Sequence, residues 1–238
     1  MEKTNKNGFL NVPTAIILAG IIIAAAVIYA FPKNSPNNDI VADKGKELTA
    51  SAVDSIQPVS NKDHIRGNPN AAVKIIEFSD LECPFCKRFH LTMQQAMDEY
   101  GKEVAWVYRH FPLDALHSKA RKEAEATECA NELGGNDKFW DYVDKLFEIT
   151  PSNNQLDLAL LPKIAAEIGL DKVKFENCLA SQKYSGHIES DVKDAVASGA
   201  RGTPYSVVIS KNGEKFIING AQPYSSVKQI IDTALGRQ

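Results

Sequence analysis

The chain divides into a long apolar run, a polar stretch and a region of regular apolar periodicity. The apolar run, residues 14–31, carries no charge and approaches the roughly 20 residues that a helix needs to cross a bilayer. The stretch that follows is rich in Pro, Asn and Ser and predicts a flexible linker. Four parts are therefore expected: a cytoplasmic tail (1–11), a transmembrane helix (12–31), a linker (32–62) and a folded domain (63–238).

The charges around the apolar run favour export of the folded domain. Lys3 and Lys6 precede the run, as is usual on the cytoplasmic side of a membrane helix. A cleaved signal peptide is the alternative, since small residues at 24–26 and 28–30 offer cleavage sites. We favour an uncleaved anchor because the run exceeds the ~7–15 apolar residues of a usual signal peptide. Both alternatives place the folded domain outside the cytoplasm, and an uncleaved anchor holds it at the cell membrane as a single-pass protein.

The first part of the folded domain predicts a strand, a helix and a second strand in succession. Residues 72–79 form a β-branched apolar run without a breaker, which is typical of a buried strand. Helical spacing follows, with Pro84 in the first turn and Gly101 at the stop. Residues 103–111 then predict the second strand.

The second part of the domain is first helical and then returns to strands. Apolar stripes at helical spacing run through about residues 116–198. Two strands follow at 205–210 and 215–220, joined by a KNGE turn, before a final helix near 225–235. Periodicity alone therefore predicts an α/β domain with an inserted helical segment.

Composition and charge exclude several classes of function. The 238 residues have a formal net charge of −3 and 44% apolar residues, which suffices for a core without help from disulfides. The chain has no basic block, no glycine-rich phosphate loop and no internal repeat. Nucleotide and nucleic-acid binding are therefore not expected. Glu189, Asp191 and Asp194 are expected on a solvated helix face, and the histidines lack the spacing of a metal-binding motif.

The pair Cys83 and Cys86 carries the main candidate chemistry. A C-x-x-C pair fits a redox-active site, half of a zinc site or a plain disulfide. Structural zinc favours two close pairs, whereas Cys129 and Cys178 lie far apart on the apolar stripes of two helices. We therefore expect no metal and no cofactor. A thiol at a helix N-terminus is stabilised as the thiolate, so Cys83 is the candidate nucleophile and Cys86 the resolving thiol.

Several segments together resemble one protein family. The segments are DHIRGNPNAAVKIIEFSDLECPFCKRFH, YRHFPL, FWDYVDKLF, GLDKVKFENCL and GARGTPYSVVI, which extend over about residues 63–238. They resemble the DsbA-like thiol-disulfide oxidoreductases, exported or membrane-anchored proteins of bacteria. The resemblance implies a thioredoxin fold with an inserted α-helical domain at about 116–198, preceded here by a single transmembrane helix.

The resemblance also implies roles for residues around the cysteines. In the family, a cis proline faces the active-site disulfide, and here that proline is Pro204. The backbone of Thr203 would pair with an extended substrate segment, beside Pro84 and Phe85 between the two cysteines. Glu77 matches a buried acid on the family's first strand that would relay protons as the second cysteine titrates. A solvent-facing or ion-paired Glu77 is the alternative.

Two residues make the direction of exchange uncertain. The best-known oxidising members carry a Pro-His pair between the cysteines, whereas Phe85 offers no polar partner to the Cys83 thiolate. Glu82 adds a negative charge beside Cys83 and opposes the thiolate in the same way; a solvated Glu82 side chain is the alternative.

Cys129 and Cys178 are expected to form a structural disulfide. In an oxidising compartment two thiols that meet in a core generally form a bridge, and some family members carry cysteines in these places. Two separate buried thiols are the alternative.

The function expected from the sequence is extracytoplasmic thiol-disulfide exchange between Cys83–Cys86 and the cysteines of exported proteins. Oxidation of those proteins is favoured, with reoxidation by a quinone-linked membrane partner implied by the family. A reductase or isomerase of the same fold is the nearest alternative. A non-catalytic anchored binding domain, with four structural cysteines, is an alternative of another class.

Overall fold

The computed structural model describes residues 52–237. The transmembrane helix expected at 12–31, the tail before it and most of the predicted linker lie outside the described residues. Within 52–237, no helix combines the length and the apolar character that membrane crossing requires.

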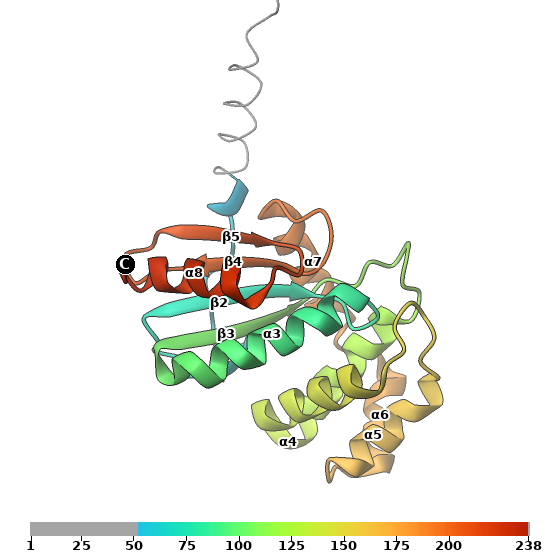
Figure 1. The fold of residues 1–238 in the computed structure, drawn as a ribbon. Coiled ribbons are helices and arrows are strands. Elements are labelled where there is room, and N and C mark those ends of the chain that lie inside the picture. Colours follow the sequence, from blue (N-terminus) through green and yellow to red (C-terminus); the bar gives the residue numbers. More distant parts are fainter. Residues whose placement is uncertain (1–51, 238) are drawn as a thin grey trace, which may run out of the picture. The chain divides into compact units, whose positions relative to one another are not determined.

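A five-stranded mixed sheet forms the centre of the domain (Figure 1). Its strands follow the order β1-β3-β2-β4-β5. Only β2 and β3 pair in parallel, and the other neighbours are antiparallel. The bounds are β1 (His64–Gly67), β2 (Val73–Ser79), β3 (Val104–His110), β4 (Tyr205–Ile209) and β5 (Lys215–Asn219).

The two central strands are apolar on both faces, and helices therefore cover both sides of the sheet. Ile75 of β2 belongs to one buried cluster, together with side chains of α3 (Pro84–Tyr100) and α8 (Tyr224–Ala234). Ile76 points to the opposite face and joins a second cluster with side chains of α7 (Ser185–Ala197). Because successive strand residues point to opposite faces, this continuous β-branched run fills two cores.

The helical insert lies between β3 and β4; its helices α4 (Ala120–Ile149), α5 (Leu161–Glu167) and α6 (Lys172–Ser181) lie together beside the sheet, whereas α7 packs on one face of the sheet (Figure 1). Its first helix, α4, changes direction at Gly135, where φ is 78° and the helical backbone is interrupted. The two apolar stripes that flank the Gly134-Gly135 pair in the sequence are therefore two halves of one kinked helix. The short 3₁₀ turns are Gly101–Glu103 and Leu158–Leu160.

The structure differs from the sequence-based expectation at two places near the start of the domain. Strand β1 was not predicted, because it has four residues and only one of them is β-branched. The packed part of the chain also begins before the predicted boundary at 63. Val53 and Ile56 are buried against the α7 face of the sheet, so the last residues of the predicted linker belong to the domain.

The expectation that Asp191 and Asp194 lie on a solvated helix face is wrong. Both side chains of α7 are buried. Asp194 Oδ2 accepts a hydrogen bond from Arg109 Nη1 at 2.6 Å, and Asp191 Oδ2 accepts one from the backbone N–H of His110 at 3.0 Å. These partners arise from β3, and helical periodicity within α7 carries no information about them.

Candidate active site

Cys83 lies at the start of α3 and is the first residue of the candidate active site. It is the N-cap residue, with an extended backbone (φ −80°, ψ 120°), and Pro84 occupies the first helical position. Proline suits that position because the first N–H groups of a helix have no partner inside the helix. Only 4% of Cys83 is exposed, whereas Cys86, one turn into the helix, is fully buried. Both cysteines are free thiols.

The surroundings of Cys83 favour its thiolate. Its pKa is lowered to about 6, chiefly because the Cys86 thiol donates a hydrogen bond to its sulfur, with smaller contributions from Thr203 and the backbone N–H groups of Cys86 and Phe85. The pKa of Cys86 is raised, first by burial and then by the neighbouring charges of Cys83 and Glu77. One thiol of the pair is therefore ionised at neutral pH and the other stays protonated.

Thr203 and Pro204 face the cysteines from the loop before β4. The peptide bond between them is cis. Cys83 Sγ lies 3.5 Å from the carbonyl oxygen of Thr203, which accepts its weak hydrogen bond. The structure thus brings together the two segments that the resemblance paired, although 120 residues separate them in sequence.

Glu77 lies on β2 with its side chain inside the domain. Burial raises its pKa to about 7, and Trp106 Nε1 donates a hydrogen bond to Glu77 Oε2 at 2.9 Å. The Tyr108 hydroxyl is also buried, without a hydrogen-bond partner among the described residues. Its pKa is raised by burial and by the charges of Glu77 and Cys86. A carboxyl group that titrates near neutral pH can hold or release a proton next to the Cys86 thiol.

A buried Asp80 shapes the loop that leads to the cysteines. Its two carboxylate oxygens accept hydrogen bonds from the backbone N–H groups of Glu82 and Leu113, both at 2.8 Å. His117 Nδ1 lies 2.8 Å from Asp80 Oδ2. In turn, the Asp80 N–H lies 3.4 Å from Cys86 Sγ. No local pattern in the sequence marks Asp80 and His117 as partners, because 37 residues separate them.

Glu82, beside the nucleophile, is fully buried rather than solvated. The backbone N–H groups of Asn153 and Asn154 donate hydrogen bonds to its carbonyl and carboxylate oxygens respectively. Glu123 of α4 lies against it, and burial together with the Glu82 carboxylate raises the pKa of Glu123 to about 10. Glu123 is therefore protonated and uncharged at neutral pH.

The surface around Cys83 is apolar. Phe85 is 54% exposed, and the guanidinium of Arg88 lies over its ring at 5.3 Å. Pro84 is also exposed. Such an apolar rim suits contact with an unfolded or extended polypeptide.

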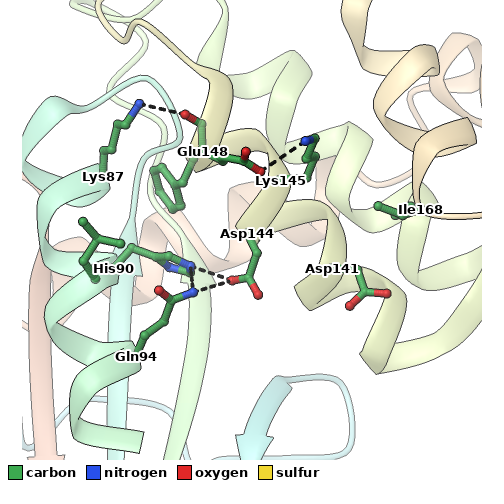
Figure 2. Close-up of a pocket in the computed structure, with 10 residues that line it drawn as sticks. Lys87, His90, Gln94, Asp141, Asp144, Lys145, Glu148 and Ile168 are labelled. Atoms are coloured by element: carbon green, nitrogen blue, oxygen red, sulfur yellow. Dashed lines mark hydrogen bonds and ion pairs between the residues drawn. The ribbon is translucent and has the colours of Figure 1, made fainter. Parts of the chain in front are cut away.

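A groove of about 620 Å³ follows α3 away from the cysteines (Figure 2). One wall carries Lys87, His90 and Gln94 of α3, and the other carries side chains of the second half of α4. His90 Nε2 lies 2.6 Å from Asp144 Oδ1, and Lys87 Nζ donates a hydrogen bond to the Glu148 carbonyl oxygen at 3.2 Å. His90 is thus a packing residue between two helices.

Cys129 and Cys178 form a disulfide that joins α4 to α6. Both sulfurs lie in the buried core of the helical insert. The bridge closes a loop over a sequence separation of 49 residues and leaves Cys83 and Cys86 as the free thiols of the chain.

Comparison with known proteins identifies the family and the fold of this domain. A family model described as Thioredoxin matches residues 59–233. The solved structure of DsbA2 from Pseudomonas aeruginosa has 26% sequence identity and a TM-score of 0.63, over 76% of this chain and 98% of that chain. A thioredoxin-like oxidoreductase from Silicibacter pomeroyi has 26% identity and a TM-score of 0.62, over 75% of this chain and 95% of that chain. BdbD from Bacillus subtilis, at 23% identity and a TM-score of 0.66, shares the fold over 76% of this chain and 96% of that chain.

Curated sequence relatives include proteins named as sodium/proton antiporters. NhaA 3 from Salinispora tropica is 35% identical over 153 residues, which are 64% of this chain and 22% of that protein. NhaA 1 from Mycolicibacterium gilvum is 30% identical over 159 residues, which are 66% of this chain and 25% of that protein. The match therefore spans about a quarter of the length of these relatives. The antiporter activity in their names is stated for those proteins and is not carried over to this chain.

Proposed function

The chain belongs to the Thioredoxin family as a DsbA-like oxidoreductase, and from this premise we propose that it oxidises the thiols of exported proteins with a Cys83–Cys86 disulfide. One observation carries the proposal: Cys83 lies at the N-terminus of α3, where the Cys86 thiol and the backbone N–H groups of the first turn lower its pKa to about 6. A low thiol pKa stabilises the reduced form of the protein and makes its disulfide a better oxidant.

The reaction consists of two thiol-disulfide exchanges. A substrate thiolate attacks Cys83 Sγ, the Cys83–Cys86 bond breaks, and Cys86 leaves with the electron pair and takes up a proton. A second substrate thiolate attacks the substrate sulfur of the mixed disulfide and releases Cys83 as the thiolate. The substrate loses two electrons to the cysteine pair. Glu77, with its pKa raised to about 7, supplies the proton that Cys86 takes up.

The residues around the cysteines would bind the substrate as an extended segment. The backbone of Thr203 lies beside Cys83 and offers polar groups for main-chain pairing. Pro84 and Phe85 supply the exposed apolar contact. Because main-chain pairing does not depend on sequence, this surface suits many different exported proteins.

The proposed location and partners follow the same premise. The domain acts outside the cytoplasm and is held at the cell membrane through residues 12–31. A quinone-linked membrane protein reoxidises the cysteine pair after each turnover. Reduction or isomerisation of disulfides is the second candidate, and it is favoured by the exposed Phe85, which gives the thiolate no polar partner.

A reduction potential and a transfer assay test the direction. The full chain, purified in detergent, is equilibrated with glutathione mixtures, and the oxidised protein is incubated with a reduced, unfolded secretory protein in the absence of glutathione. An oxidase has a potential towards about −120 mV and transfers one disulfide per molecule, whereas a potential near about −270 mV supports the reductase. Cys83→Ala abolishes transfer in either case. A Cys83 thiol that resists alkylation up to about pH 9 would instead support the non-catalytic binding domain.

A further inference from the structure

A cluster of histidines and carboxylates lies where β1, β3, α4 and α7 meet. We propose that His64, Glu128 and His187 of this cluster bind a divalent transition-metal ion of the zinc type. One ligand atom of each residue lies within 4.8 Å of the other two. The site uses none of the residues that surround Cys83, and thiol chemistry plays no part in it.

Each ligand comes from a different element of the fold. His64 is the first residue of β1, Glu128 lies in the first half of α4, and His187 lies in the first turn of α7. Spacings of 64 and 59 residues separate these ligands, so no sequence motif marks them. The expectation of no metal site was based on the local spacing of cysteines and histidines. Ligands that lie this far apart in the sequence produce no such spacing.

Three imidazole rings converge on one carboxylate oxygen. Glu128 Oε1 lies 2.8 Å from His64 Nε2, 2.9 Å from His110 Nε2 and 3.6 Å from His187 Nε2. The His64 ring is held flat against Phe139, with ring centroids 3.5 Å apart. Glu128 is buried, so its carboxylate is held in place inside the domain.

The distances around His187 leave room for an ion between its ring and the carboxylates. His187 Nε2 is 3.6 Å from Glu128 Oε1 and 3.9 Å from Asp191 Oδ2, too far for hydrogen bonds. Ligand atoms about 2.1 Å from a tetrahedral zinc ion lie about 3.4 Å from one another. The 3.6 Å between His187 Nε2 and Glu128 Oε1 is close to that spacing, and ligand atoms of His187 and His64 lie within 4.8 Å of each other. His64 Nε2 and Glu128 Oε1, now 2.8 Å apart, would separate by about 0.6 Å to admit the ion.

The chemistry of the donors indicates the class of ion. Two imidazole nitrogens and one carboxylate oxygen suit zinc and its transition-metal neighbours, whereas calcium and magnesium prefer oxygen ligands alone. His110 contacts Glu128 on the inner side and orients its carboxylate, as outer residues do in metal sites. Asp191 Oδ2 accepts a hydrogen bond from the His110 N–H and lies 3.9 Å from His187 Nε2, so it borders the proposed site.

The cluster has a route to solvent. The His187 side chain is 28% exposed, whereas those of His64 and Glu128 are buried. His187 and Asp191 line a small cavity of about 110 Å³ that opens beside the loop at residues 57–63. An ion can therefore enter past His187 without opening the core. Once bound, it joins the edge of the sheet to α4 and α7 and stabilises the domain.

A metal titration of the full chain in detergent tests the proposal. Cys83→Ala and Cys86→Ala are introduced first, so that no free thiol competes for the ion. Cobalt added to this protein should give a visible spectrum of a nitrogen- and oxygen-ligated ion with one ion per chain. Zinc should displace it and raise the melting temperature by about 5–10 °C at one hundred times its dissociation constant.

Three further variants locate the site. His187→Gln removes a partly exposed ligand and should weaken binding at least about 100-fold, and His110→Gln should weaken it about 10- to 100-fold. Glu189→Gln, on the same helix but outside the cluster, should leave the affinity unchanged. If the protein without these three substitutions gives no cobalt spectrum, the proposal is overturned, whether or not the variants fold. Equal affinity in His187→Gln and Glu189→Gln also overturns it, because the ion then binds elsewhere.

Discussion

Changing the pH should reveal an ionisation of Cys83 near pH 6. In a flexible chain a cysteine titrates at about 8.5. Here the Cys86 thiol, the backbone N–H groups of the first helical turn and the Thr203 surroundings lower the pKa of Cys83 to about 6. Cys86 is buried, and its pKa is raised, so it stays protonated over the same range. Alkylation of the reduced protein should therefore reach half its maximal rate near pH 6.

The size of the effect follows from the two pKa values. At pH 7 about 90% of Cys83 is thiolate, against about 3% for an ordinary cysteine. This difference stabilises the reduced protein by about 1.4 kcal/mol and raises its reduction potential by about 30 mV. Because the pKa is depressed, the stabilisation is complete above about pH 8.5 and is lost as the pH falls through 6. The potential should fall by about 59 mV per pH unit below pH 6 and by about 30 mV per unit above it.

Variants of Cys86 test the assigned cause. Cys86→Ala removes the donor to the Cys83 sulfur and should move the alkylation midpoint upward, whereas Cys86→Ser keeps a hydroxyl donor and should move it less. In both variants Cys83 is the free thiol that remains, so iodoacetamide labelling followed by mass spectrometry reports on it alone. A midpoint near 8.5 in the parent protein, or a slope of 59 mV per unit up to pH 8, would refute the reasoning.

Three further predictions concern the scaffold. Glu77→Gln should stabilise the domain at pH 8 but not at pH 4. Burial raises the pKa of Glu77 to about 7, so ionisation of its carboxyl destabilises the folded state as the pH rises from 4 to 8. Urea unfolding of both proteins at the two pH values measures the difference. Replacing Cys129 and Cys178 by Ala opens a loop of 49 residues and should cost about 4 kcal/mol of unfolding free energy without changing the thiol titration. Asp194→Ala leaves the buried Arg109 guanidinium short of a partner and should cost about 3–5 kcal/mol, and a loss below 1 kcal/mol in a denaturant titration would contradict the assigned ion pair.

Local patterns in the sequence predicted the strands other than β1 and the helix that begins at the cysteines. The β-branched run at 72–79, the proline after Cys83 and the stop at Gly101 each act within one strand or one helix, and the strand and helix they predict lie there in the structure. The thioredoxin-like fold with a helical insert is confirmed by the similarity to DsbA2. The place of Thr203 and Pro204 came from the family resemblance, since nothing local connects that loop to the cysteines.

The surroundings of the cysteines depended on the tertiary structure. Sequence periodicity indicates whether a side chain is buried. Whether a buried acid contacts a cation, a histidine or another acid depends on how the elements pack. The pKa of Glu123 is raised by burial and by Glu82, and Asp80 pairs with His117, because the loop before α3 packs against the start of α4.

The same reason explains why Asp191 was placed wrongly and why the histidine cluster left no trace in the sequence. Helix α7 alternates polar and apolar residues as a solvated helix does, yet β3 presents His110 to its polar face. The sequence by itself determined which segments become strands and helices, apart from the short strand β1, and which thiol begins a helix. The tertiary structure decided the charge each buried polar group carries, because electrostatic energies depend on distances between groups that the chain order leaves open.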